Sequence, residues 1–327
     1  KMLAVVENSG TYKVTGADVN ITKAVNNITG AEAGTTEING TNIGVNADIN
    51  NDIVVKGSAT SADASHFKGE TDNQGSITLS GGILGSEIKN TTGTGALTIA
   101  GAVEANADIT EKTLIVESGA GKTLTVDSGK TVVVTESLAN SGEIILNAAD
   151  SELELKTADS MTNEGAISGN GTLVINTNLT NQGENGIISS VVDIQTGSLE
   201  SAISKLTGDK DISNAGTLTL TGDGTNAHGI SGTGNVEFTG TAQNNGEINL
   251  TGAGKVTTTG ELTTDADGYT NSEWTEDAEQ ALWDGALAAA GMRVGMFAEA
   301  KVVPAAITRY TTFCQTLFKT PAQAHKA

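Results

Sequence analysis

The stretch 214–260, NAGTLTLTGDGTNAHGISGTGNVEFTGTAQNNGEINLTGAGKVTTTG, repeats one short pattern three times. An Asn-x-Gly or Gly-x-Gly turn is followed by alternating apolar and polar residues, and then by Thr-Gly or Ser-Gly. Alternation with a period of two predicts a strand with one buried face. We expect the glycines to supply the positive φ angles of tight corners, and Asn to occupy the same corners where Gly is absent.

The same pattern recurs over most of the chain. Asn-x-Gly turns begin at Asn73, Asn140, Asn163, Asn181, Asn214 and Asn244. We interpret the shorter intervals between them as one coil, and the longer ones, after Asn181 and after Asn214, as one coil plus a loop. Internal repetition of this kind predicts a solenoid, whose units bury their apolar faces only by stacking. At roughly 20–25 residues per turn, the part of the chain before residue 266 predicts about 11–13 coils in a rod on the order of 50–60 Å long.

We therefore predict an all-β fold, a right-handed parallel β-helix with a C-terminal α-helical segment. Residues 1–72 form irregular N-terminal coils and a cap, 73–270 the regular β-solenoid, and 271–327 the helical segment. Within the rod, the segment 113–134 predicts three successive strands with tight turns. The segment 196–210 predicts a short helix, with a longer loop between coils as the alternative.

The composition changes abruptly near residue 270. Both prolines, both arginines, both tryptophans and Cys314 lie beyond it. Thr275 is a favourable N-cap for a helix over 276–303, and Pro304 ends that helix. The apolar side chains of this segment are the candidates for assembly or pore-threading contacts: Leu282, Trp283, Leu287, Met292, Met296, Phe297, Phe313, Leu317 and Phe318.

The charge balance restricts the classes of partner. The formal net charge is −21, with 18 basic and 39 acidic side chains, and nearly all of the excess lies before residue 271. Such a surface repels nucleic acid and anionic membranes. The chain has no uninterrupted apolar run long enough to cross a bilayer, so the sequence predicts no transmembrane helix. The single cysteine excludes an intrachain disulfide.

Motifs for catalysis or ligand binding are weak. The run Ser118–Thr123, SGAGKT, resembles the end of a phosphate-binding loop, but Val116 stands where the motif needs Gly. Leu124 to Val126 also continue as a strand instead of a helix, so we interpret the run as a turn. The acidic corner Asp265–Asp267 has Thr263 in place of the first calcium ligand. We predict no catalytic residue, cofactor or metal ion.

The repeats at 163–175, 214–222, 230–240 and 244–254, of the forms NxGxIxLTG and ISGxGxLxI, resemble bacterial autotransporter passenger domains and other parallel β-helix surface adhesins. In that family an acidic, cysteine-poor β-helix is followed by a helical linker and an outer-membrane β-barrel. The resemblance implies a surface-exposed or secreted passenger, with a β-barrel encoded beyond Ala327.

Three functions remain open from the sequence. The first is a non-enzymatic stalk for adhesion or structural display, whose partners are host or neighbouring-cell surface molecules. The second is a self-assembling filament or surface-layer subunit, in which the C-terminal apolar residues contact copies of the same chain. The third is a polysaccharide-active β-helix enzyme. The rod disfavours it, because positions 1–260 contain no Arg and only Tyr12, Phe67 and Phe238 as aromatic side chains.

Overall fold

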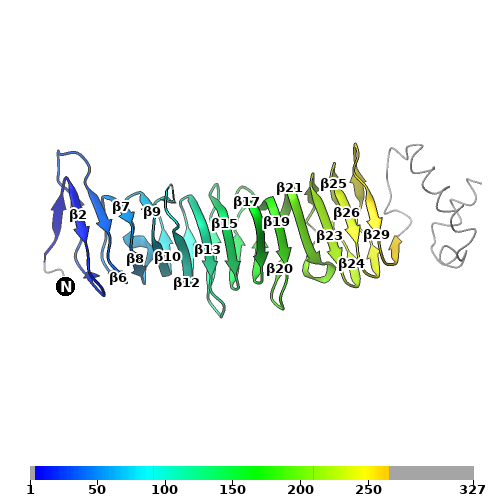
Figure 1. Ribbon diagram of the computed structural model, residues 1–327, viewed down its shortest axis with the longest axis horizontal. Helices are drawn as coiled ribbons and strands as arrows, with labels where there is room; N and C mark the ends of the chain where they lie inside the picture. Colours follow the sequence, from blue (N-terminus) through cyan, green and yellow to red (C-terminus); the bar gives the residue numbers. More distant parts are fainter. Residues whose placement is uncertain (1–3, 91, 209, 265–327) are drawn as a thin grey trace, which may run out of the picture.

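The computed structural model describes residues 4–90, 92–208 and 210–264. These residues form a parallel β-solenoid of about 13 turns, with strands that run across the long axis of a rod (Figure 1). Each turn passes through three strand positions, so the rod has three sheets around one core. The predicted solenoid is confirmed.

Sheet 1 contains one strand, or the first half of one strand, from each turn. Its core-facing ladder includes Ile53, Thr71, Ile88, Ile109, Val132, Leu153, Leu173, Val192, Ile212 and Ile230. Its members are β2 (Thr11–Val14), β5 (Thr35–Ile38), β7 (Asp52–Val55), β9 (Thr71–Asn73), β11 (Ile88–Lys89), the first halves of β13 (Ile109–Val116), β15 (Thr131–Asn140), β17 (Glu152–Asn163), β19 (Thr172–Asn181) and β21 (Val191–Ala202), then β22 (Ile212–Asn214), β25 (Ile230–Gly232) and β28 (Ile248–Leu250).

Sheet 2 follows sheet 1 in every turn. Its members are β3 (Asn20–Ile21), β6 (Ile43–Val45), β8 (Ser58–Ser61), the first halves of β10 (Ser76–Leu84) and β12 (Ala96–Ala105), the second halves of β13, β15, β17, β19 and β21, then β23 (Thr217–Thr221), β26 (Asn235–Phe238) and β29 (Val256–Thr258). All pairings between these strands are parallel.

Sheet 3 is less regular and contains the remaining strands. These are β1 (Val6–Asn8), β4 (Val25–Asn27), the second halves of β10 and β12, β14 (Thr123–Val126), β16 (Glu143–Leu146), β18 (Ala166–Gly169), β20 (Ile187–Ile188), β24 (Gly224–Asn226), β27 (Ala242–Asn244) and β30 (Leu262–Thr264). Two short 3₁₀ helices, η1 (Ala64–His66) and η2 (Ile203–Lys205), lie on this side. Ile49, Phe67 and Leu206 continue the ladder by single bridges.

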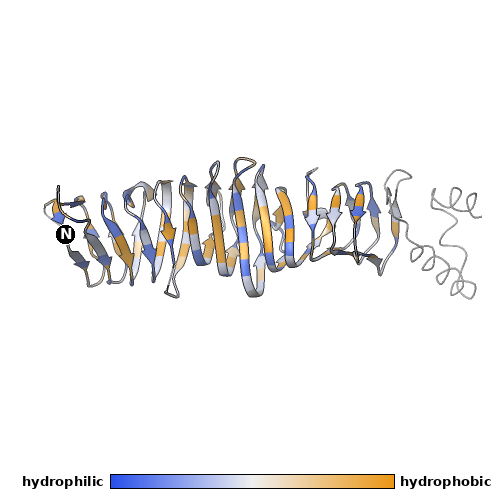
Figure 2. Cartoon of the chain, turned by 90° about the horizontal axis from the view of Figure 1, so that it is seen from above, coloured by the Kyte–Doolittle hydropathy of each residue, from blue (hydrophilic) through white to orange (hydrophobic). Residues whose placement is uncertain are grey.

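The core is a narrow column of stacked aliphatic side chains. Along each strand, buried and outward-facing residues alternate, as in β14 and β16. Apolar residues accordingly recur along the strands of every turn, separated by polar corners (Figure 2). Phe67 and Phe238 are the largest fully buried side chains among the described residues. A column this thin needs few aromatic residues, which accounts for their scarcity in the rod.

Several local predictions can be compared with these strands. The three strands predicted within 113–134 are confirmed by the second half of β13, by β14 and by the first half of β15. The helix predicted within 196–210 is wrong, because β21 continues to Ala202 and only η2 follows. The register explains the strand, since Leu199 pairs with Leu179 in the preceding turn and with Leu218 in the next. The predicted C-terminal helical segment lies outside the described residues.

The expected positive φ is confirmed at Gly183, where φ is 78°, but the explanation of the other Asn-x-Gly turns needs correction. Among the described residues, only Asp18 and Asn42 are non-glycine residues with positive φ. Gly75 and Gly165 are not in the left-handed region either, and a Cβ atom there would meet a carbonyl oxygen of the preceding turn at 2.0 and 2.3 Å. Glycine is required at these corners because stacked turns leave no room for a side chain.

Candidate functional surfaces

The Asn residues of the Asn-x-Gly motifs point into the rod and form hydrogen-bonded ladders. Asn140 donates from Nδ2 to Asn163 Oδ1 at 2.8 Å, and Asn163 donates to Asn181 Oδ1 at 2.7 Å. Asn181 continues the row to Ser201 Oγ at 2.9 Å. The three Asn side chains are at most 4% exposed. Buried amides need such partners, so this row stabilises the corner between sheets 2 and 3 and offers no binding site.

A second buried polar cluster surrounds Glu111 in sheet 1. The Glu111 side chain is 0% exposed. Asn73 donates to its Oε1 at 2.7 Å, and Asn90 lies 3.4 Å from its Oε2. Burial is the largest effect on this carboxyl group and raises the pKa of Glu111 to about 7, against the opposing effect of the two amides. Among the described residues, Glu111 is therefore the one whose pKa is shifted furthest from its usual value.

The outward side of sheet 1 is strongly charged. Glu37 is nearly buried there between Lys56 and Lys13, whose ammonium nitrogens lie 2.9 and 3.3 Å from its carboxylate oxygens. The hydrogen bond from Lys56 is the largest effect, and it lowers the pKa of Glu37. Both lysines keep part of their side chains in water, so these pairs mainly fix local geometry.

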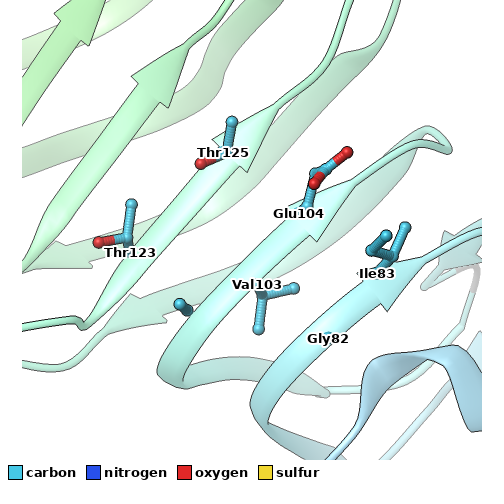
Figure 3. Close-up of a pocket in the computed structure, with 7 residues that line it drawn as sticks. Gly82, Ile83, Val103, Glu104, Thr123 and Thr125 are labelled. Atoms are coloured by element: carbon cyan, nitrogen blue, oxygen red, sulfur yellow. The ribbon is translucent and has the colours of Figure 1, made fainter.

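A shallow hollow of about 360 Å³ lies on sheet 3 where small side chains leave space. Gly82 and Ala102 are among its lining residues, and Ile83, Glu104 and Thr125 stand side by side on β10, β12 and β14 (Figure 3). Ile83 is 48% exposed. Glu104 is the only titratable residue that lines this hollow, so the hollow offers no acid–base pair for general catalysis.

The phosphate-loop-like motif considered from the sequence is a turn, and the two histidines of the described residues make contacts between neighbouring coils of the rod. Ser118–Thr123 connects β13 to β14, and Gly119 and Gly121 have φ angles of 116° and 76°, so the interpretation as a turn is confirmed. His228 is buried, and its Nδ1 lies 2.7 Å from the Lys210 carbonyl oxygen. His66, at the end of η1, has its Nδ1 2.9 Å from Asp48 Oδ1. Each of these contacts joins one turn to the next.

The described residues contain no group of three or more His, Cys, Asp or Glu side chains that could hold a metal ion. No helix within the described ranges has the length and apolar character to cross a membrane. The candidate contact residues Leu282, Trp283, Leu287, Met292, Met296, Phe297, Phe313, Leu317 and Phe318, and the acidic corner at Asp265 and Asp267, lie outside the described residues.

Comparison of the chain with protein-family models, curated proteins and solved structures gave no match. Functional assignment therefore depends on the geometry and charge of the rod.

Proposed function

We propose that this chain is a non-enzymatic extracellular protein, a β-solenoid stalk for adhesion or structural display on a bacterial cell surface. The observation that carries the proposal is the unbroken rod. Parallel pairing continues through sheet 2 from β3 to β29, and one core of aliphatic side chains runs along it. At about 4.8 Å per turn, about 13 turns separate the two ends by roughly 60 Å. A rod of this kind suits a spacer with long, flat outer faces.

Charge and sequence pattern add support for the finer points. A net charge of −21 keeps an extended β protein from aggregating in a crowded surface layer. The repeats resemble those of autotransporter passengers, so the proposal includes a right-handed winding, as expected for parallel crossovers, and an outer-membrane β-barrel encoded downstream. The proposed partners are molecules on host or neighbouring cells.

The test is accessibility of the rod on intact cells. An antibody raised against residues 73–264 should label intact cells, and external protease should remove the label before any cytoplasmic marker is lost. Deletion of the gene should reduce attachment of the cells to their natural surfaces. Label that appears only after permeabilisation would contradict surface display. Turnover of any member of a panel of acidic and neutral glycans would contradict the non-enzymatic assignment.

A second candidate function is a subunit of a filament or surface layer, and the two ends of the rod favour it. Three apolar residues at each end are only partly buried against the core: Val6, Tyr12 and Val19 at one end, and Leu250, Val256 and Leu262 at the other. Among the described residues, the first and the last strand of each sheet pair on one side only, and such strand edges tend to pair with other chains. Electron microscopy of concentrated protein should then show end-to-end filaments, and substitution of Leu282, Trp283 and Leu287 by Ser should prevent them if the C-terminal segment makes the contact.

A further inference from the structure

The outward side of sheet 2 has an uncharged centre over seven successive turns, from β8 to β19, with Lys112, Glu117 and Glu136 at its margins. Two columns of side chains face outward there, paired in register at every step from turn to turn except between Ser137 and Ser160. One column is Ser58, Ser76, Ala96, Thr113, Ser137, Ser160 and Asn178, and the other is Thr60, Thr78, Thr98, Ile115, Ala139, Thr162 and Thr180. We call these two columns the uncharged face. All of their side chains are half-buried or exposed.

Sheet 1 provides a matched comparison, because its outward columns belong to the same seven turns of the same rod. These positions are occupied by Asp52, Val54, Glu70, Asp72, Glu87, Lys89, Asp108, Thr110, Thr131, Val133, Glu152, Glu154, Thr172 and Val174. Eight of these fourteen residues are charged, against none of the fourteen on the uncharged face. The chain has a net charge of −21, yet none of its charged side chains lies in the two columns of the uncharged face.

The uncharged face is chemically complementary to itself. Each hydroxyl group can both donate and accept a hydrogen bond, so two Ser/Thr surfaces match in either direction. A two-fold dimer requires such a patch, since the same surface is used by both subunits. Two copies that met through sheet 1 would instead place rows of carboxylates opposite each other. Ser, Ala and Thr are also short, which lets two sheets approach to about 10 Å.

We propose that two copies of this chain pair through the uncharged face. Seven turns at about 4.8 Å give a contact about 34 Å long, and two columns with their margins are about 14 Å wide. Such a patch buries roughly 450 Å² on each copy, or about 900 Å² in total, which is the size of a transient interface. The pairing is therefore weak for two molecules in solution and becomes strong where many copies are arrayed together.

The test is sedimentation equilibrium of the full chain, up to the highest soluble concentration. The unsubstituted chain should show a reversible monomer–dimer equilibrium. Added salt should strengthen it, because salt screens the repulsion between two molecules of charge −21. A contact held by ion pairs would weaken instead, and that result would overturn the proposal.

Matched double variants locate the contact. Thr98→Glu with Thr162→Glu places two carboxylates on the uncharged face and should raise the dissociation constant at least about tenfold, because like charges would meet across the interface. Thr125→Glu with Ser189→Glu adds the same charge at outward positions of sheet 3 and should change it less than about twofold. Thermal unfolding of both variants checks that the rod is intact.

Three results would reject the pairing. They are a monomer at every concentration, equal weakening by both double variants, or association that disappears on truncation after Thr264 while the face variants leave it unchanged. The last result would assign self-association to the C-terminal segment and favour the filament. None of these results bears on whether the rod is displayed on cells, which the antibody experiment decides separately.

Discussion

Asn163 is fixed at three points inside the rod. It accepts a hydrogen bond from Asn140, and its amide nitrogen lies 2.7 Å from both Gly165 O and Asn181 Oδ1. Asn163→Ala removes three buried hydrogen bonds and opens a small cavity, although Asn140 still donates to Ala166 O and Gly165 O still accepts from Ile187 N, so we expect the free energy of unfolding to fall by about 2–4 kcal/mol. Urea titration followed by circular dichroism measures the change. Asn185→Ala, at an exposed turn, is the control and should stay within about 0.5 kcal/mol.

Glu111 should make stability depend on pH. In the unfolded chain its carboxyl group titrates near 4.5, whereas in the folded rod its pKa is about 7. Between these values the folded state binds more protons, so the free energy of unfolding falls as pH rises from about 4.5 to 7. The full effect corresponds to about 3 kcal/mol.

Glu111→Gln keeps an acceptor for Asn73 and removes the titration. We expect this variant to lose much less stability than the unsubstituted chain between pH 5 and 8, measured by denaturant midpoints across that range. Glu184→Gln removes the same charge from an exposed turn and should leave the pH profile unchanged. Parallel profiles for the unsubstituted chain and Glu111→Gln would contradict a buried carboxyl group that titrates near neutrality.

At the scale of single elements, the contact between turns governs the corners. A Cβ atom on Gly75 would lie 2.0 Å from the carbonyl oxygen of Gly57 in the turn below. Gly75→Ala should therefore force adjacent turns apart and cost about 3 kcal/mol. Gly85 has nothing within 4 Å of its Cβ position, so Gly85→Ala should have little effect. Thermal melting of the two variants compares them, and similar melting temperatures would show that the corner can relax.

The sequence predicts the strands well because each strand carries its own signal of alternation. Leu138 and Asn140 share one phase of that alternation, as do Met161 and Asn163, and all four point into the core. The alternation thus indicates that Asn140 and Asn163 are buried, although the Asn-x-Gly pattern by itself predicts only a tight corner. Asn at a corner is usually a turn residue, and only the stacking of turns distinguishes a ladder from a turn.

The spacing of the motifs is harder to interpret for a geometric reason. Asn181 ends a strand of sheet 2, Asn214 a strand of sheet 1, and Asn244 a strand of sheet 3. The two long intervals therefore arise because the motif moves to a different corner, and the predicted extra loop is not needed to explain them. The number of residues per turn also varies. Leu114 pairs with Leu97 of the preceding turn and with Leu138 of the following turn, and Leu138 is further away along the sequence. The sequence alone could not align outward residues into columns.

At the scale of the whole molecule, the rod is an array in which each turn contacts mainly its neighbours, so stability is close to a sum over turns. Ile212, Ile230 and Ile248 occupy the same position in successive turns and are evenly spaced along the sequence. Deletion of residues 212–229 removes one complete turn and presents Ile230 to Val192 in place of Ile212. We expect a folded rod that is shorter by about 4.8 Å.

X-ray scattering at low angle measures the length of that variant, and circular dichroism its strand content. Deletion of only 212–220 is the matched control, because it removes half a turn and brings outward residues into the core column. That control should lose its cooperative unfolding transition. If the full-turn deletion failed in the same way, the rod would depend on particular neighbours along its axis, and its turns could not be treated as equivalent units stacked on one core.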